Sequence, residues 1–362
     1  GKLIGPAVAA ELAISVQDLK PLCAALEEHD GEKQNASDLA LGHLVGALLA
    51  GSGDKTLAGP NAGPWCELLE RVSRSLRLSV AYAIRPLLAT LCDNQEVFTP
   101  KQQSSAGHTS RRLLEFAWSK TPRNAWLVVH ALRCVCRTFE SDPAESALLI
   151  RRYLEPAHLA QFDFEEMPWL AREVKWLIRL DPKLVMDIYR AAFGHQQPSD
   201  EPTPIGSSRI MSMVSNRRQD YQMALYELAE TFPEFLESAP EQATLALVGV
   251  VESYVAQRHS SGSGEAQEEV FDFAGQQVRL RTDYRAIWDE GDLYRNDEPS
   301  KMLDAFQQFL EGLATHQHSE SKLRALIGIL VSENRLAVVW RRLLLTGARF
   351  PENIGRKILP LA

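Results

Sequence analysis

The sequence predicts an all-α protein, an α-solenoid of helix pairs of the HEAT, armadillo or TPR kind with one small β-hairpin inserted. Three observations lead to this prediction. Prolines recur where helical stretches begin, and apolar residues repeat at helical spacing in several segments. Only one segment shows the alternation that is typical of strands.

Prolines mark the expected helix starts. Proline is tolerated in the first helical turn, because its missing N–H would have no partner there and its fixed φ suits a helix. Two spacings between successive prolines, 21 and 39 residues, match one helix with its turn and one helix pair of such repeats. The seven prolines are Pro122, Pro143, Pro182, Pro233, Pro240, Pro299 and Pro351.

The chain divides into three expected parts. Residues 1–120 form an N-terminal helical subdomain, with an alanine- and leucine-rich stretch at 7–50 and a polar break between helices at 101–110. Residues 121–260 form the helical-repeat region. Residues 261–362 carry the hairpin, followed by C-terminal helices.

Two segments interrupt the helices. Residues 194–208 contain several prolines, each of which keeps the preceding residue out of the α region, so this segment should be an extended loop. Apolar and polar residues alternate over 270–281 on both sides of a turn at 274–277, which predicts the β-hairpin. A lone hairpin is marginal in water, so we expect this one to pack on the helices.

Apolar patterns identify the expected core. Residues 125–139 are apolar nearly all round, as an inner helix covered on both sides would be. Stripes at helical spacing predict two further helices with one buried face each. These stripes are Tyr221, Leu225, Leu228, Ala229 and Phe232, and Met302, Phe306, Phe309, Leu310 and Leu313.

Charge and hydropathy exclude some partners. The net charge of −8 and the pI near 5.7 argue against a nucleic-acid footprint, which needs a basic face. Arginines do cluster, but acidic residues interrupt most of the clusters, so we expect solvated helix faces there. The three clusters are Arg71/Arg74/Arg77, Arg111/Arg112 and Arg341/Arg342. No apolar stretch reaches the roughly 20 residues of a membrane span, so no membrane partner is expected.

The sequence contains no recognisable catalytic, metal-binding or cofactor-binding motif. We therefore assign no catalytic residue, no metal ligand and no cofactor. The five cysteines form no C-x-x-C pair. We interpret them as buried, reduced thiols of a cytoplasmic protein.

The candidate partner-binding residues lie where the regular pattern is interrupted. Arg217, Arg218 and Asp220 follow the proline-rich loop, and Tyr284 and Trp288 follow the hairpin. Insertions in solenoids often lie on the binding face, and aromatic and arginine side chains are common interface anchors. Two alternatives stay open. One of the arginines could pair with a carboxylate of a neighbouring helix, and the two aromatic residues could simply dock the hairpin.

Residues around these positions resemble the helical region of large bacterial STAND-type NTPases, some of which act in antiphage defence. The resemblance covers residues 204–299 and rests on the segments 213–221, 232–236 and 283–289. Members of this group combine an N-terminal effector, a nucleotide-driven switch and a C-terminal helical-repeat sensor. The switch and its phosphate-binding motif are missing from this sequence. The resemblance therefore implies a fragment of a longer polypeptide, and it transfers no catalytic residue.

We therefore expect a recognition or scaffold module of a larger bacterial signalling or defence protein, without catalytic activity of its own. Its partner would be another protein or other domains of the same polypeptide. Two alternatives remain at this stage: a self-standing enzyme with an unrecognised helical active site, and an oligomerisation or packing segment without a ligand.

Overall fold

The computed structural model describes residues 62–76, 78–93, 98–195, 216–259, 268–273, 275–281, 297–315 and 319–359. These residues are mostly helical, and their only sheet has two strands, so the predicted all-α class with a small hairpin is confirmed. The chain forms two compact units, which meet in sequence between Ile150 and Arg151. The stretch 7–50 and most of the predicted loop 194–208 lie outside the described residues.

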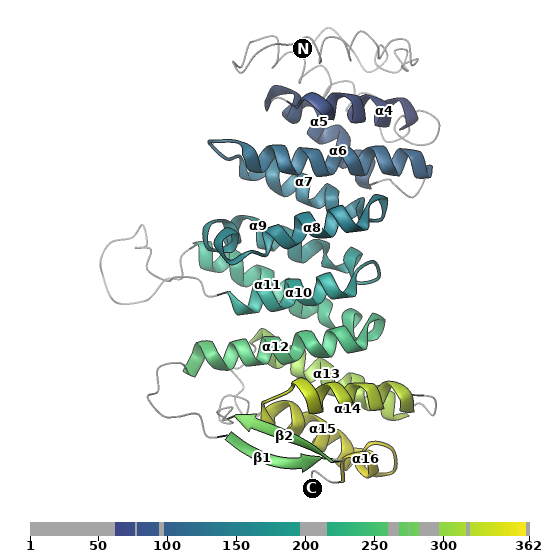
Figure 1. The fold of residues 1–362 in the computed structure, drawn as a ribbon, viewed down its shortest axis with the longest axis vertical. Helices are drawn as coiled ribbons and strands as arrows, with labels where there is room; N and C mark the ends of the chain where they lie inside the picture. Colours follow the sequence, from purple (N-terminus) through teal and green to yellow (C-terminus); the bar gives the residue numbers. More distant parts are fainter. Residues whose placement is uncertain are drawn as a thin grey trace, which may run out of the picture. The chain divides into compact units, whose positions relative to one another are not determined.

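The first unit is built from helices that pack on near neighbours in the chain (Figure 1). Helix α4 packs on α6, α5 packs on α7, and α6 also packs on α7. Helix α8 crosses from this unit into the second. The bounds are α4 (Ala62–Val72), η2 (Ser73–Ser75), α5 (Leu78–Asp93), α6 (Pro100–Ser119), α7 (Ala125–Arg137), η4 (Phe139–Ser141) and α8 (Pro143–Tyr153).

The second unit has two layers of helices. Helices α9, α11, α13 and α15 pack one on the next in one layer, and α10, α12 and α14 do so in the other. Stacked helix pairs produce this arrangement, because each pair buries its apolar faces against the following pair. The bounds are α9 (Pro156–Leu177), α10 (Pro182–Gly194), α11 (Asn216–Ser238), α12 (Pro240–His259), α13 (Glu298–Thr315), α14 (Glu320–Glu333), α15 (Ala337–Arg349), η6 (Pro351–Gly355) and α16 (Arg356–Ile358).

Five of the seven prolines stand at helix starts, as predicted. The prediction is wrong for Pro122, which precedes α7, and for Pro233, which lies inside α11. At the start of α7 the cap is Asn124, whose side chain accepts a hydrogen bond from the backbone N–H of Leu127. Around Pro233 the helix continues because fully buried side chains on both sides hold it against its neighbours. These include Phe232, Phe235 and Leu236.

The expected polar break at 101–110 is wrong, because these residues belong to α6. Thr99 and Gln102 form a capping box, in which each side chain accepts a hydrogen bond from the other residue's backbone N–H. Inside the helix the hydroxyl of the buried Thr109 donates to the carbonyl of Ser105 at 2.8 Å. Hydroxyls satisfied in this way can be buried without an orphaned polar group, so a polar sequence can form a packed helix.

The apolar patterns predict the buried faces well. Nearly every apolar side chain of α7 is buried, and so are most members of the two stripes. Within the stripes the exceptions are half-buried: Leu225 on α11, and Phe309 and Leu313 on α13. On α7 the exception is Trp126, whose side chain is exposed, so this helix is not covered all round as predicted. None of the described helices combines the length and the apolar character that crossing a bilayer requires.

The hairpin consists of β1 (Glu268–Phe273) and β2 (Gln276–Arg281), which pair antiparallel. β2 already begins at Gln276, so the predicted turn at 274–277 was too long by two residues at its end. Gly275 takes a φ of 82°, which favours glycine, and its N–H donates to the Asp272 carboxylate at 3.0 Å.

Candidate functional site

Three of the predicted partner-binding residues lie in the first turn and a half of α11. Arg218 and Asp220 are exposed. Arg217 instead turns toward α9, where its guanidinium carbon lies 4.1 Å from the ring centre of Phe164 and its Nη2 lies 4.0 Å from Asp163 Oδ1. Of the two alternatives left open by the sequence, pairing with a carboxylate of a neighbouring helix therefore holds for Arg217.

Asp163 is the centre of this cluster. Its side chain is 2% exposed, and its Oδ2 lies 2.8 Å from Nε2 of His195, directly after α10. Tyr221 of α11 packs edge-on against His195 and donates its hydroxyl to the carbonyl of Ala192. Burial raises the pKa of the Tyr221 hydroxyl, and the charge of Asp163 raises it further. The cluster therefore fastens α9, α10 and α11 together, and it turns most of its polar groups away from solvent.

The remaining two predicted residues, Tyr284 and Trp288, lie outside the described residues. The hairpin before them packs on α15, as expected. The rings of Phe271 and Phe273 lie 6.2 and 5.8 Å from that of Trp340, measured between centroids. Binding of a partner by the five predicted residues stays a prediction.

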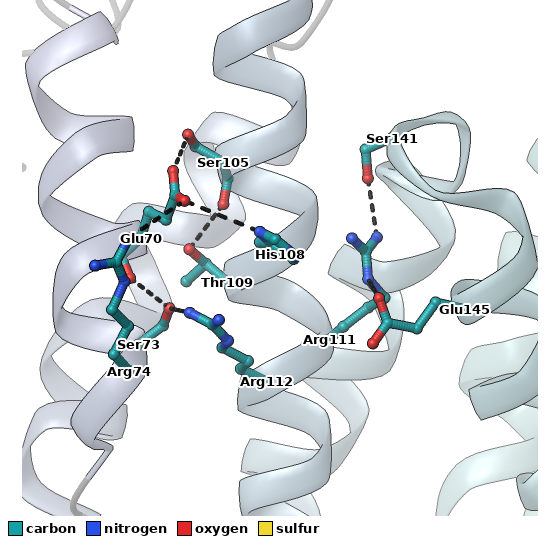
Figure 2. Close-up of polar contacts among 10 residues, drawn as sticks. All are labelled: Glu70, Ser73, Arg74, Ser105, His108, Thr109, Arg111, Arg112, Ser141 and Glu145. Carbon is teal, nitrogen blue, oxygen red and sulfur yellow. Dashed lines mark hydrogen bonds and ion pairs between the residues drawn. The ribbon is translucent and has the colours of Figure 1, made fainter.

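A buried arginine in the first unit was not anticipated. The side chain of Arg111 is 3% exposed; it donates from Nε to Glu145 at 3.0 Å and from Nη1 to Ser141 at 2.9 Å (Figure 2). Arg342 of the second unit is similar, with Nη1 2.9 Å from Asp304. The prediction of solvated faces is therefore wrong for one member of each of these two arginine pairs.

Helix geometry explains why the pairs split. Adjacent residues on a helix point about 100° apart. When one of two neighbouring arginines points toward solvent, the other can therefore point into the interface with the next helix. The inward arginine is tolerated because its carboxylate partner stays half-exposed: Glu145 is 49% exposed and Asp304 is 56% exposed. The anion keeps part of its hydration while the cation donates hydrogen bonds to protein oxygens, which limits the desolvation cost of the pair.

A second polar cluster joins α4 to α6. Ser105 donates its hydroxyl to Glu70, whose other oxygen lies 3.9 Å from both Arg74 and His108 (Figure 2). In a serine nucleophile site the histidine contacts the serine so that it can take its proton. Here the carboxylate lies between the serine and the histidine, so the arrangement fastens two helices and lacks the geometry for acyl transfer.

The described residues offer little for metal or thiol chemistry. No group of three or more histidine, cysteine or acidic side chains among them could hold a metal ion. Four of the five cysteines are described, and all four are buried free thiols, as predicted. Burial raises the pKa of the Cys66 thiol to about 12, with Cys92 and Glu67 adding to the shift. A neutral thiol is a poor nucleophile.

An open cleft lies between α11 and α13 in the second unit. It has a volume of about 340 Å³, and its lining includes Pro233, Leu236, Glu237, Phe309, Gly312 and Leu313. Leu236 is fully buried, whereas Pro233, Glu237 and Gly312 are exposed at the rim. The predicted core stripe of α13 is incomplete for this reason. The sequence signal that could have revealed the cleft is Gly312, because a glycine leaves this part of the α13 wall without a side chain.

No protein-family model, curated protein or solved structure matches the chain.

Proposed function

We propose that this chain is a protein-recognition module that binds a peptide segment of its partner in the cleft between α11 and α13. The observation that carries the proposal is the cleft itself, an opening of about 340 Å³ with largely apolar walls and an exposed rim. Ligand sites in proteins are concave, mostly apolar and of this order of size, about 300–1,000 Å³.

The position of the cleft in the helix stack supports this function. Helices α11 and α13 are neighbours in one layer, so the groove between them belongs to the regular packing. Solenoids of the HEAT, armadillo or TPR kind bind their partners along surfaces built from such neighbouring helices. A protein partner also fits the charge of the chain better than nucleic acid does, because the net charge is −8.

The wider setting is proposed from the sequence. The resemblance of residues 204–299 to STAND-type NTPases suggests a sensor-like part of a larger bacterial signalling or antiphage defence protein. Four buried free thiols fit a reducing compartment such as the cytoplasm. The exposed Arg218 and Asp220 remain a predicted second contact region. Arg217 is a poorer probe of binding, because replacing it would also remove its contacts with α9.

The test uses a substitution that fills the cleft. An added Cβ at Gly312 would meet no atom within 4 Å, so Gly312→Trp can extend into the open space without displacing the backbone. A random peptide library displayed on phage is selected on the full chain and then rescreened on this variant. We expect peptides that bind the wild type and Gly312→Ala but not Gly312→Trp.

Circular dichroism of both variants serves as the folding control. If no selected peptide distinguishes folded Gly312→Trp from the wild type, the cleft is not a peptide site and the proposal is wrong.

A further inference from the structure

The charged side chain that lines the cleft is acidic, and the helix that bears it is acidic as well. From Tyr221 to its end at Ser238, α11 contains four glutamates and no lysine or arginine. The exposed carboxylate of Glu237 lines the cleft itself. On the opposite wall the exposed polar residue is the neutral Gln308.

The four glutamates fall into two pairs. Glu227 and Glu230 have basic partners in the neighbouring helices, at 3.5 Å from Arg172 and 3.7 Å from Lys301. Glu234 and Glu237, in the half of the helix that borders the cleft, take part in no ion pair within the described part of the chain. The negative charge at the cleft is therefore available to a partner.

The apolar part of the cleft has room for large side chains. Phe309 and Leu313 are only half-buried although they belong to the apolar stripe of α13. Between them and Pro233, the missing side chain of Gly312 leaves open space. Covering these half-exposed groups with an apolar side chain would contribute about 25 cal/mol per Å² of apolar surface removed from water.

Resting on the function proposed above, we propose that the cleft binds a basic amphipathic segment of a protein partner. An apolar side chain of that segment lies between Pro233 and Phe309, and a lysine or arginine beside it pairs with Glu237. Complementary charge at such a rim contributes specificity and association rate, while the apolar anchor contributes most of the affinity.

The same peptide selection tests this inference through the composition of the cleft-dependent peptides. We expect an apolar residue flanked by lysine or arginine in these sequences. One such synthetic peptide, labelled with a fluorophore, is then titrated with the full chain. Glu237→Lys should weaken its binding roughly tenfold, and raising the salt concentration should weaken binding to the wild type but affect the variant less.

The matched control is Glu115→Lys on α6, an exposed position in the first unit, which changes the net charge by the same amount. This variant should bind like the wild type. If the cleft-dependent peptides are neutral or acidic, the inference that the partner segment is basic is wrong. The proposed function, peptide binding in the cleft, would still hold. Self-association of the chain that is lost in Gly312→Trp would identify a second copy as the occupant and would also overturn the inference. If no cleft-dependent peptide is found, the inference fails together with the proposed function.

Discussion

At the scale of single residues, neighbours in the sequence have opposite roles. Arg111 is buried and hydrogen-bonded to Glu145 and Ser141, whereas Arg112 is half-exposed and reaches one hydroxyl, that of Ser73, at 3.3 Å. Composition cannot separate the two, since both are arginines in a polar stretch. Their energetic contributions should nevertheless differ, because only one of them leaves a buried network incomplete when it is removed.

We expect Arg111→Ala to lower the free energy of unfolding by about 2–4 kcal/mol, because the hydroxyls of Ser141 and the buried Ser146 lose their donor and a cavity remains. The adjacent Arg112→Ala should cost less than about 1 kcal/mol. Urea unfolding followed by circular dichroism measures both values. Equal losses in the two variants would show that Arg111 has no special structural role.

The buried thiol of Cys66 predicts a loss of stability at alkaline pH. Its pKa is about 12 in the folded chain against an ordinary value of 9.0, so between these values the unfolded state loses the proton while the folded state keeps it. The contribution of this buried thiol to the free energy of unfolding is complete below pH 9.0. It is lost as the pH rises toward 12, at about 1.4 kcal/mol per pH unit.

The measurement compares unfolding free energies at neutral pH and at about pH 10. Between these two pH values, the free energy of unfolding should fall by about 1 kcal/mol less in Cys66→Ala than in the wild type. Buried tyrosines such as Tyr189 titrate in both proteins, so the difference between the two losses isolates the thiol. An unchanged alkaline loss in Cys66→Ala would contradict the assignment.

At the scale of elements, the space around a helix decides what a glycine contributes. A Cβ at Gly107 of α6 would lie 1.8 Å from the hydroxyl of Ser141, which also accepts the hydrogen bond from Arg111. A Cβ at Gly328 of α14 would meet nothing within 4 Å. The close approach of η4 to α6 therefore requires glycine at position 107. The packing around α14 does not require glycine at position 328.

We expect Gly328→Ala to raise the free energy of unfolding by about 0.5–1 kcal/mol, because alanine restricts the unfolded chain and suits a helix. Gly107→Ala should instead lower it by more than about 1 kcal/mol, because Ser141 must move away from its arginine. Thermal unfolding of the two variants is a sufficient measurement. A stabilised Gly107→Ala would mean that α6 and η4 are packed less closely than described.

At the scale of the whole molecule, both units contain helices that pack on the helix two places further along the chain, as α4 does on α6 and α9 does on α11. Among the described residues the hairpin is the only sheet, and the segments between the helices are short. The far-ultraviolet circular dichroism of the full chain should therefore show the double minimum of α-helix. A spectrum dominated by the single minimum of β-structure would rule out this fold.

The fold class was accessible from the sequence because it depends on local signals. Proline at helix starts, the stripe through Tyr221 and Phe232, and the alternation over 270–281 each act over a few residues. The stripe and the alternation predicted their elements correctly, and proline did so at five of its seven positions. Where these local signals failed, contacts with residues distant in the sequence determined the secondary structure. Pro233 stays inside a helix because buried neighbours hold it there, and the polar residues 101–110 form a helix that other helices cover.

The sequence by itself therefore determined the class of the fold, its helix periodicity and the place of the hairpin. Only the tertiary structure decided which polar groups are buried and where the chain is open. Asp163, His195 and Arg217 meet although they belong to different segments, and the cleft beside Gly312 exists because two helices far apart in sequence lie side by side. Helical periodicity depends on residues that are close together in the sequence. A cleft or a buried polar cluster depends on residues that are far apart in the sequence and that only packing brings together.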